Sequence, residues 1–187
     1  HALDPRRLVA PECATDCTLR YTLDLDRVER SFESVVAVGA GTYVAPTPTW
    51  LAHPDPMPRG AFAITIDGAE EPGDAFTPVA FATGLRRAGG SAGHYVLPTE
   101  DYGEGSFAAF GKLRHRAIQA AGGAIEIVLV GDEPLAMDDA AVAKWIGDDA
   151  RCVAQLYVHF PVQRATVFVV PIEGPTHVVF RSEERRV

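Results

Sequence analysis

A serine between glycines is the sharpest match to a catalytic motif in this sequence. Residues 89–93 read Gly-Gly-Ser-Ala-Gly, which fits the G-x-S-x-G pattern that holds the nucleophile of many serine hydrolases. That motif needs a buried strand before the serine and a helix after it, because the tight turn between them presents the hydroxyl. Residues 85–88 and 94–98 predict neither element, since the second run is extended and ends in Pro98. We therefore interpret residues 89–93 as a glycine-rich loop and keep hydrolysis by Ser91 as a third hypothesis.

Metal ligands are not grouped along the chain. No two histidines are four residues apart and none is followed by Glu, so no helix presents two histidines to one zinc ion. Acids occur in adjacent pairs, but neighbours on a helix point in different directions and cannot form a carboxylate dyad. We expect no catalytic, cofactor-binding or metal-binding residue in this chain, and no cofactor. The histidines are His1, His53, His94, His115, His159 and His177, and the acid pairs are Glu70-Glu71, Asp138-Asp139 and Asp148-Asp149.

The three cysteines favour one local disulfide. Cys13 and Cys17 flank a short polar loop just before a strand-like run, and a bond between them would hold the chain end in place. The alternative is two reduced thiols in a cytosolic protein. Cys152 is predicted to lie on the inner face of a helix, where a free thiol acts as a small hydrophobic group.

Composition and charge indicate a globular chain that does not bind nucleic acid. Hydrophobic residues make up 47% of the 187 residues and charged residues 22%, which is ordinary globular usage. Lys and Arg total 17 against 25 for Asp and Glu, and the net charge of -8 disfavours phosphate backbones and anionic membranes as partners. No apolar run approaches the ~20 residues that a membrane span requires. The chain begins with His1 rather than Met, which leaves room for a removed signal peptide.

The first two thirds of the chain predict short strands separated by turns. Residues 18–25 and 61–67 alternate apolar and polar side chains, as a half-buried strand does. Proline-rich runs at 45–50 and 53–58 are predicted to be loops, because proline has no N–H for a ladder. Residues 114–123 fit either a strand or a short helix. Further strands are expected at 35–38, 77–81, 106–113 and 125–130, and such strands favour an antiparallel sandwich.

The pattern changes after Gly131. Asp138 is a suitable N-cap, and the apolar spacing that follows predicts an amphipathic helix of about six turns over 138–160, stopped by Pro161. Residues 165–170 form an unbroken β-branched and aromatic run, which predicts a strand covered on both faces. We predict an α+β fold, mainly antiparallel and sandwich-like, with one long amphipathic helix near the C-terminus. The expected domains are a β-rich unit, 1–131, and the helix and strand that open a second unit, 132–187.

A series of packing motifs between Phe107 and Pro171 resembles a known peptidase family. In chain order these are Phe107-Ala-Ala-Phe-Gly-Lys-Leu113, Ile125-Glu-Ile-Val-Leu-Val130, the helix bearing Trp145 and ending Tyr157-Val-His-Phe-Pro-Val-Gln-Arg164, and Val167-Phe-Val-Val-Pro171. The series is similar to metallopeptidases related to glycyl aminopeptidase, in the thermolysin-like gluzincin clan, of the bacterial secreted type that also carries a PDZ domain. In those proteins an N-terminal β domain precedes such a helix and strand. The two-cysteine start and residues 19–25 are similar to the same secreted branch.

The resemblance also implies what this chain lacks. The family binds zinc through a His-Glu-x-x-His helix and a later Glu, and no position here matches them. Residues 176–187 do not resemble the glycine-rich edge strand that the family has next. The resemblance therefore implies a chain that is inactive alone, a zinc ion held by a segment outside it, and a secreted or periplasmic location in a bacterium.

Two classes of function are expected beside the serine-hydrolase hypothesis. The leading one is a non-catalytic N-terminal region that shapes or shields the cleft of a catalytic domain. Its expected partners are that domain or a second copy, through the helix face of 138–160, and a peptide substrate, with neither nucleic acid nor membrane. The alternative is a stand-alone β-sandwich that binds peptide or carbohydrate through Trp50 and the loops of residues 46–58.

Overall fold

The computed structural model describes residues 20–69, 72–89, 93–103, 106–120 and 122–171. It has an α+β fold with mostly antiparallel strands and a 19-residue helix near the C-terminus, which confirms this part of the predicted class. The sandwich-like arrangement stays a prediction. The elements are α1 (Leu25–Glu29), β1 (Val36–Ala37), β2 (Tyr43–Pro46), α2 (Thr47–Trp50), β3 (Ala61–Thr65), β4 (Thr77–Thr83), β5 (Arg86–Arg87), β6 (His94–Pro98), the 3-10 helix η1 (Thr99–Asp101), β7 (Phe107–Ala120), β8 (Gly123–Val130), α3 (Asp139–Tyr157) and β9 (Arg164–Val169).

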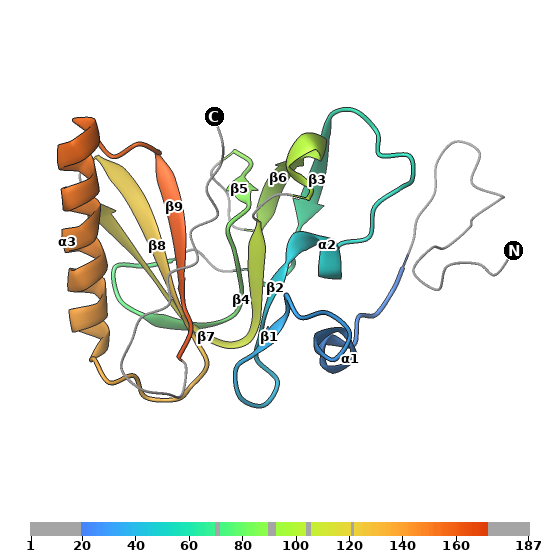
Figure 1. Ribbon diagram of the computed structural model, residues 1–187, viewed down its shortest axis with the longest axis horizontal. Helices are drawn as coiled ribbons and strands as arrows, with labels where there is room; N and C mark the ends of the chain where they lie inside the picture. Colours follow the sequence, from blue (N-terminus) through green and yellow to red (C-terminus); the bar gives the residue numbers. More distant parts are fainter. Residues whose placement is uncertain (1–19, 70–71, 90–92, 104–105, 121, 172–187) are drawn as a thin grey trace, which may run out of the picture.

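The strand β7 organises the larger, six-stranded sheet (Figure 1). The strands follow the order β1-β2-β7-β8-β9, and β4 pairs with the other edge of β7. Residues 107–110 of β7 pair with β2, whereas residues 113–120 pair with β8, while β4 stays on the opposite edge along both parts. Two strands therefore share one edge of β7, one after the other, and the sheet curls.

The change of partner takes place at Gly111, which has a φ of +106°. A Cβ atom there would lie 2.2 Å from the carbonyl oxygen of Gly41. The N–H of Lys112 donates to Oγ1 of Thr42 (3.2 Å), and the N–H of Gly131 donates to the carbonyl of Lys112 (2.8 Å). Because Thr42 is fully buried, its hydroxyl satisfies a backbone donor at the point where the partner strand changes.

A smaller antiparallel sheet, in the order β3-β6-β5, lies beside the larger one (Figure 1). Its core of Ile64, Tyr95 and Leu97 is in contact with Phe81 of β4, which joins the two sheets. The strand predicted at 61–67 is confirmed as β3, and the extended run that ends at Pro98 is β6.

The helix α3 connects β8 to the parallel strand β9 and covers one face of the larger sheet (Figure 1). The carboxylate of Asp138 accepts the N–H of Ala141 (2.7 Å), which confirms the predicted N-cap. Asp139, in the first turn, forms an ion pair with Arg114 of β7 and ties the helix start to the sheet. The core between helix and sheet consists of Ala120, Ile125, Ile127, Leu129, Val142, Ala143, Ile146 and Ala150.

Several predictions about local structure are wrong. Within 18–25, the described part has no strand; instead the carboxylate of Asp24 accepts the N–H of Arg27, and α1 begins at Leu25. Residues 45–50 are not a loop but the end of β2 and the short helix α2. The helix predicted to reach 160 ends at Tyr157. Cys152 is exposed rather than inward-facing, because it lies off the helix face that buries Val142, Ile146 and Ala150. For residues 114–123 either a strand or a short helix was expected, and residues 114–120 are a strand that continues β7.

The bend at Gly111 gives the first testable prediction. Gly111→Ala and Gly122→Ala both place a side chain at positive φ, at a cost of about 1–2 kcal/mol each. Only Gly111 meets a neighbouring backbone, since nothing lies within 4 Å of a Cβ at Gly122. Gly111→Ala should therefore lower the free energy of unfolding by about 1–3 kcal/mol more than Gly122→Ala does, as measured by urea denaturation. Equal losses would show that the close approach to Gly41 does not matter.

Candidate functional site

The clearest cluster of charged side chains surrounds Glu126, in the middle of β8. Its Oε1 lies 3.3 Å from Nη2 of Arg87 on β5 and 3.2 Å from Nε of Arg164 on β9. Its Oε2 lies 3.3 Å from Nε2 of His115 on β7. The side chains of Glu126, His115 and Arg87 are buried, whereas that of Arg164 is 42% exposed. Four strands from both sheets therefore meet at one carboxylate.

The electrostatic surroundings keep Glu126 ionised. Burial alone would raise the pKa of its carboxyl group, because the charged form is poorly solvated there. The contact with His115 and the positive charges of Arg87 and Arg164 outweigh burial, so the pKa lies below its ordinary value. An ionised carboxylate has no proton to give, which makes Glu126 a poor general acid. We interpret the cluster as an ionic tie between the smaller sheet and the centre of the larger one.

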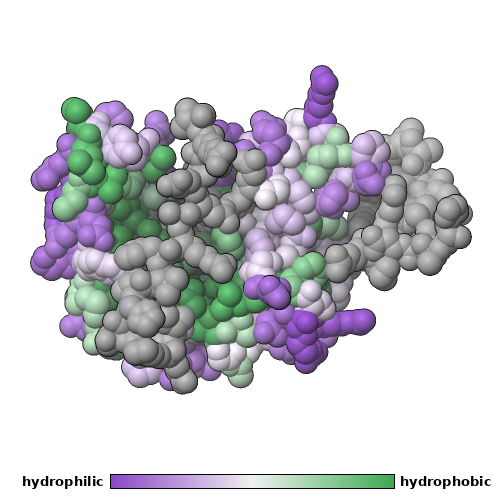
Figure 2. Space-filling model, in the orientation of Figure 1, coloured by the Kyte–Doolittle hydropathy of each residue, from purple (hydrophilic) through white to green (hydrophobic). Residues whose placement is uncertain are grey.

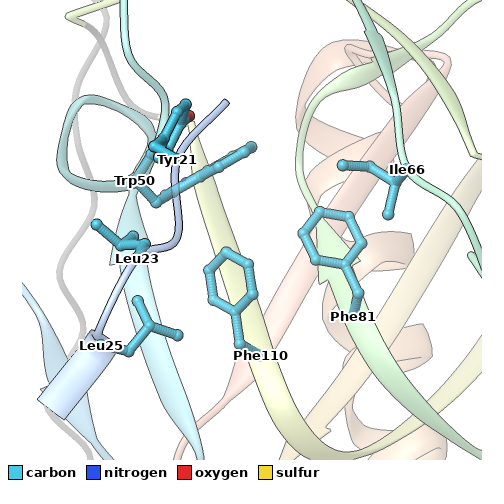
Figure 3. Close-up of a pocket in the computed structure, with 7 residues that line it drawn as sticks. All are labelled: Tyr21, Leu23, Leu25, Trp50, Ile66, Phe81 and Phe110. Atoms are coloured by element: carbon cyan, nitrogen blue, oxygen red, sulfur yellow. The ribbon is translucent and has the colours of Figure 1, made fainter. Parts of the chain in front are cut away.

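A second feature is an open cavity of about 430 Å³ with aromatic walls (Figure 3). Phe110 of β7 lies between one wall from the N-terminal segment and α2 and another from β3 and β4 (Figure 3). Its ring centroid is 5.6 Å from that of Trp50 and 5.4 Å from that of Phe81, both edge-to-face. The lining residues are Tyr21, Leu23, Leu25, Trp50, Ile66, Phe81 and Phe110.

Hydrogen bonds hold one wall of this cavity in place. The hydroxyl of Tyr21 donates to the carbonyl of Trp50 and accepts the N–H of Ala52, both at 3.1 Å. Burial raises the pKa of Tyr102 to about 12, so its hydroxyl stays protonated and donates to the carbonyl of Leu51. Nε1 of Trp50 is buried and has no hydrogen-bond partner among the described residues. The cavity is thus lined by apolar and aromatic side chains, with one buried, unpaired donor inside a residue of its wall.

A third feature is the exposed end of α3. Leu156, Tyr157 and Val158 are 81%, 61% and 93% exposed, and Val162 beyond them is also exposed. Figure 2 shows hydrophobic side chains at the upper left, where the end of α3 lies in Figure 1. Val158 has a φ of +69°, a conformation that a β-branched residue rarely adopts. Among the described residues no other non-glycine residue has positive φ.

Only some of the residues singled out in the sequence lie in the described part of the structure. Ser91, Cys13 and Cys17 lie outside the described residues. Among those described, no three His, Cys, Asp or Glu side chains gather as metal ligands. The pairing of His115 with Glu126 was not predicted from the sequence. The available signal was one charged residue inside the apolar run of 125–130, since a buried charge needs partners. Trp50 and Trp145 both pack against core clusters.

Comparison with known proteins gives no relative for this chain. No family model matches it, and neither a curated protein nor a solved structure is significantly similar to it. In the part of the chain that the structure describes, no helix has the length and apolar character to cross a membrane.

The Glu126 cluster gives the second prediction. Glu126→Gln should lower the free energy of unfolding at pH 7 by about 3 kcal/mol, because it removes the negative charge from a buried ionic cluster that contains Arg87 and Arg164. The native pKa of Glu126 is depressed, so this contribution is present above its unfolded pKa of about 4.3 and is lost as pH falls through the native value. Urea unfolding of both proteins from pH 7 to pH 3 should show the difference shrinking.

The matched control is Asp132→Asn, which removes an exposed ion pair with Lys112. It should leave the unfolding midpoint almost unchanged at every pH, because solvent screens the pair. A Glu126→Gln loss that persists at pH 3 would show that the side chain matters for packing rather than charge.

Proposed function

We propose that this chain is a non-catalytic N-terminal region of a secreted zinc metallopeptidase, which docks on a catalytic domain and shapes its cleft. The zinc ion and the His-Glu-x-x-His motif belong to that domain in this proposal, and the location is outside the cytoplasm of a bacterium. The motifs between Phe107 and Pro171 support the family, and the surface of α3 supports the docking.

The division of the apolar face of α3 carries the proposal. Val142 and Ile146 in its first half are buried against the sheet. Val153 is half-buried and Tyr157 is largely exposed, so the same face is left open in its second half. Each large apolar side chain that is buried contributes roughly 1.5–3 kcal/mol, so an interface here has a sizeable driving force. This is the partial coverage expected of a helix that also contacts a second domain.

The backbone at Val158 adds independent support. Glycine is the usual residue at a left-handed helix C-terminus, since a β-carbon there costs roughly 1–2 kcal/mol. Val158 is almost fully exposed, so no contact within the described chain offsets this cost. Strained residues persist where a function uses them. A valine at this position is accounted for if its side chain is buried by a partner.

Val158→Gly gives the third prediction, because it separates stability from docking. It should raise the free energy of unfolding by about 1 kcal/mol by relieving the positive φ. It should also weaken binding to the catalytic domain at least tenfold. Leu156→Asp should weaken binding equally without lowering Tm, since that side chain is exposed. Thermal denaturation and calorimetric titration of the co-purified domain measure the two effects.

The control and the contradicting results are distinct. Val142→Asp should unfold the chain itself, because it buries an unpaired charge. The reading frame that adjoins or continues this one should encode His-Glu-x-x-His. Absence of that motif, or tight binding of one zinc ion by this chain alone, would contradict the family. Concentration-dependent dimers that Leu156→Asp dissociates would assign the α3 surface to self-association instead.

A second candidate function is favoured by the aromatic cavity. The alternative of a stand-alone β-sandwich that binds peptide or carbohydrate relied on Trp50, which does line this cavity. The lining residues are apolar or aromatic, and Nε1 of Trp50 is buried rather than open to the cavity. Sugar hydroxyls would find few partners there, whereas an apolar peptide side chain would match the walls.

The cavity gives the fourth prediction. In a Trp145→Phe background, where Trp50 is the sole tryptophan, a capped peptide of alternating leucine and proline should shift the fluorescence in a saturable way. Leu23→Asp, in one wall, should remove the shift, while Val36→Asp, exposed and outside the cavity, should preserve it. A hexasaccharide should have no effect. A shift that survives Leu23→Asp would place peptide binding elsewhere.

A further inference from the structure

The strand β9 lies at an edge of the larger sheet with a sequence suited to its interior. It pairs with β8 on one side, and no described residue pairs with its other side. Every residue from 165 to 170 is half-buried, so neither face is fully covered. Continuous β-branched and aromatic runs are typical of strands that are covered on both faces, as strands inside a parallel sheet are. The incomplete burial of β9 at the edge of the described sheet therefore leaves apolar surface for a further element to cover.

The other edges of the same sheet are protected against pairing. The strand β1 has only two residues. The strand β4 contains Pro78, which cannot donate a hydrogen bond, and its register shifts between Val79 and Phe81. Short length, proline and bulges are the usual ways in which proteins prevent edge association. None of these occurs in β9, which is six residues long and has no proline.

The register of β9 fixes which backbone groups face outward. The N–H of Ala124 donates to the carbonyl of Gln163 (2.9 Å), so residues 163, 165, 167 and 169 direct their backbone groups toward β8. Orientation alternates along a strand in a parallel ladder. The N–H and carbonyl groups of Arg164, Thr166 and Phe168 therefore face away from β8, and no described strand pairs with them.

The side chains of β9 define the chemistry of that strand. Phe168 lies on the face opposite α3, and Val167 and Val169 lie on the face toward it. Only Nε of Arg164 contacts Glu126. Its two terminal nitrogens make no hydrogen bond or ion pair with a described residue. A residue directly opposite Arg164 on an added strand would lie about 5 Å away at Cβ, within reach of the guanidinium.

We infer that the outer edge of β9 binds an extended segment of a partner protein, with apolar residues opposite Val167, Phe168 and Val169 and a carboxylate opposite Arg164. The inference deepens the proposed function, on which it rests for the identity of the partner. It adds the mode of binding, which is strand addition, and the charge that selects the segment.

A second copy of this chain is a poorer occupant. An antiparallel two-fold pairing centred on Val167 would set Arg164 opposite Val170, which provides no charge for the guanidinium. An acidic segment of another protein satisfies the backbone and the arginine together.

The fifth prediction uses site-resolved amide exchange in the full chain. The outward amides of Thr166 and Phe168 should exchange fast, while those of Ala165 and Val167 are protected by the β8 ladder. Protection of the outward amides in a dilute monomer would mean that the chain covers its own edge. Protection that grows with concentration would mean self-association. Either result would overturn the inference.

The binding test uses two capped probes, Thr-Val-Val-Val-Thr-Val-Glu and its reverse, which place the glutamate opposite Arg164 in antiparallel or parallel pairing. One of them should protect the outward amides and bind at least tenfold tighter than its Glu→Gln version. Arg164→Gln should remove that preference. Thr166→Pro should abolish binding with Tm preserved, because its N–H faces outward, whereas the matched Val167→Pro should destabilise the fold.

Two outcomes oppose the inference outright. One is binding that survives Thr166→Pro, and the other is no binding of either probe at millimolar concentration. Because the probes contain no peptidase sequence, either outcome leaves the proposed docking through the end of α3 standing. Conversely, the probes could bind at β9 while Leu156→Asp leaves binding to the catalytic domain unchanged. That result would contradict the proposed docking through the end of α3 and leave strand addition at β9 standing.

Discussion

The geometry of this protein depends on the place where β7 exchanges one partner for another. A side chain at Gly111 would collide with the backbone of Gly41, so only glycine lets β7 pass this close to the start of β2 where its pairing changes to the end of β8. The hydroxyl of Thr42 then accepts the backbone N–H of Lys112, which keeps a buried donor satisfied across the change. Because two strands share one edge of β7, the sheet curls. The curl creates one face for α3 and another that meets the smaller sheet.

The two faces of β8 do different physical work. Ile125, Ile127 and Leu129 point toward α3 and form an apolar core, whereas Glu126 and Val128 point the other way. Glu126 is the one acidic residue in the buried set among the described residues, and it is held between positive side chains from both sheets. Such a cluster is costly to break but does not need to add stability over an apolar core, and we interpret it as fixing how the two sheets align.

Local sequence signals predicted the elements whose formation is decided by near neighbours. The Asp138 cap, the apolar spacing after it and the alternation of 61–67 each depend on residues within a few positions, and all three are confirmed. The strand predicted over 18–25 fails for a related reason. Alternation is necessary for a half-buried strand but not sufficient, since a partner strand must also be present. At Asp24 the side-chain hydrogen bond to the N–H of Arg27 begins a helix instead.

By itself, then, the sequence determined the α+β class, the long C-terminal helix and a net charge that disfavours nucleic acid. Only the tertiary structure decided that Glu126 meets Arg87 and Arg164, that Trp50 lines a cavity, and that β9 is the outermost described strand on its side of the sheet. The physical reason is the range of the interactions. Caps and periodicity act within a turn or two of the chain, whereas the two arginines that contact Glu126 are about 40 residues away on either side. The bend at Gly111 determines which distant strands pair with each part of β7. From the sequence alone, this glycine cannot be told apart from one in an ordinary turn.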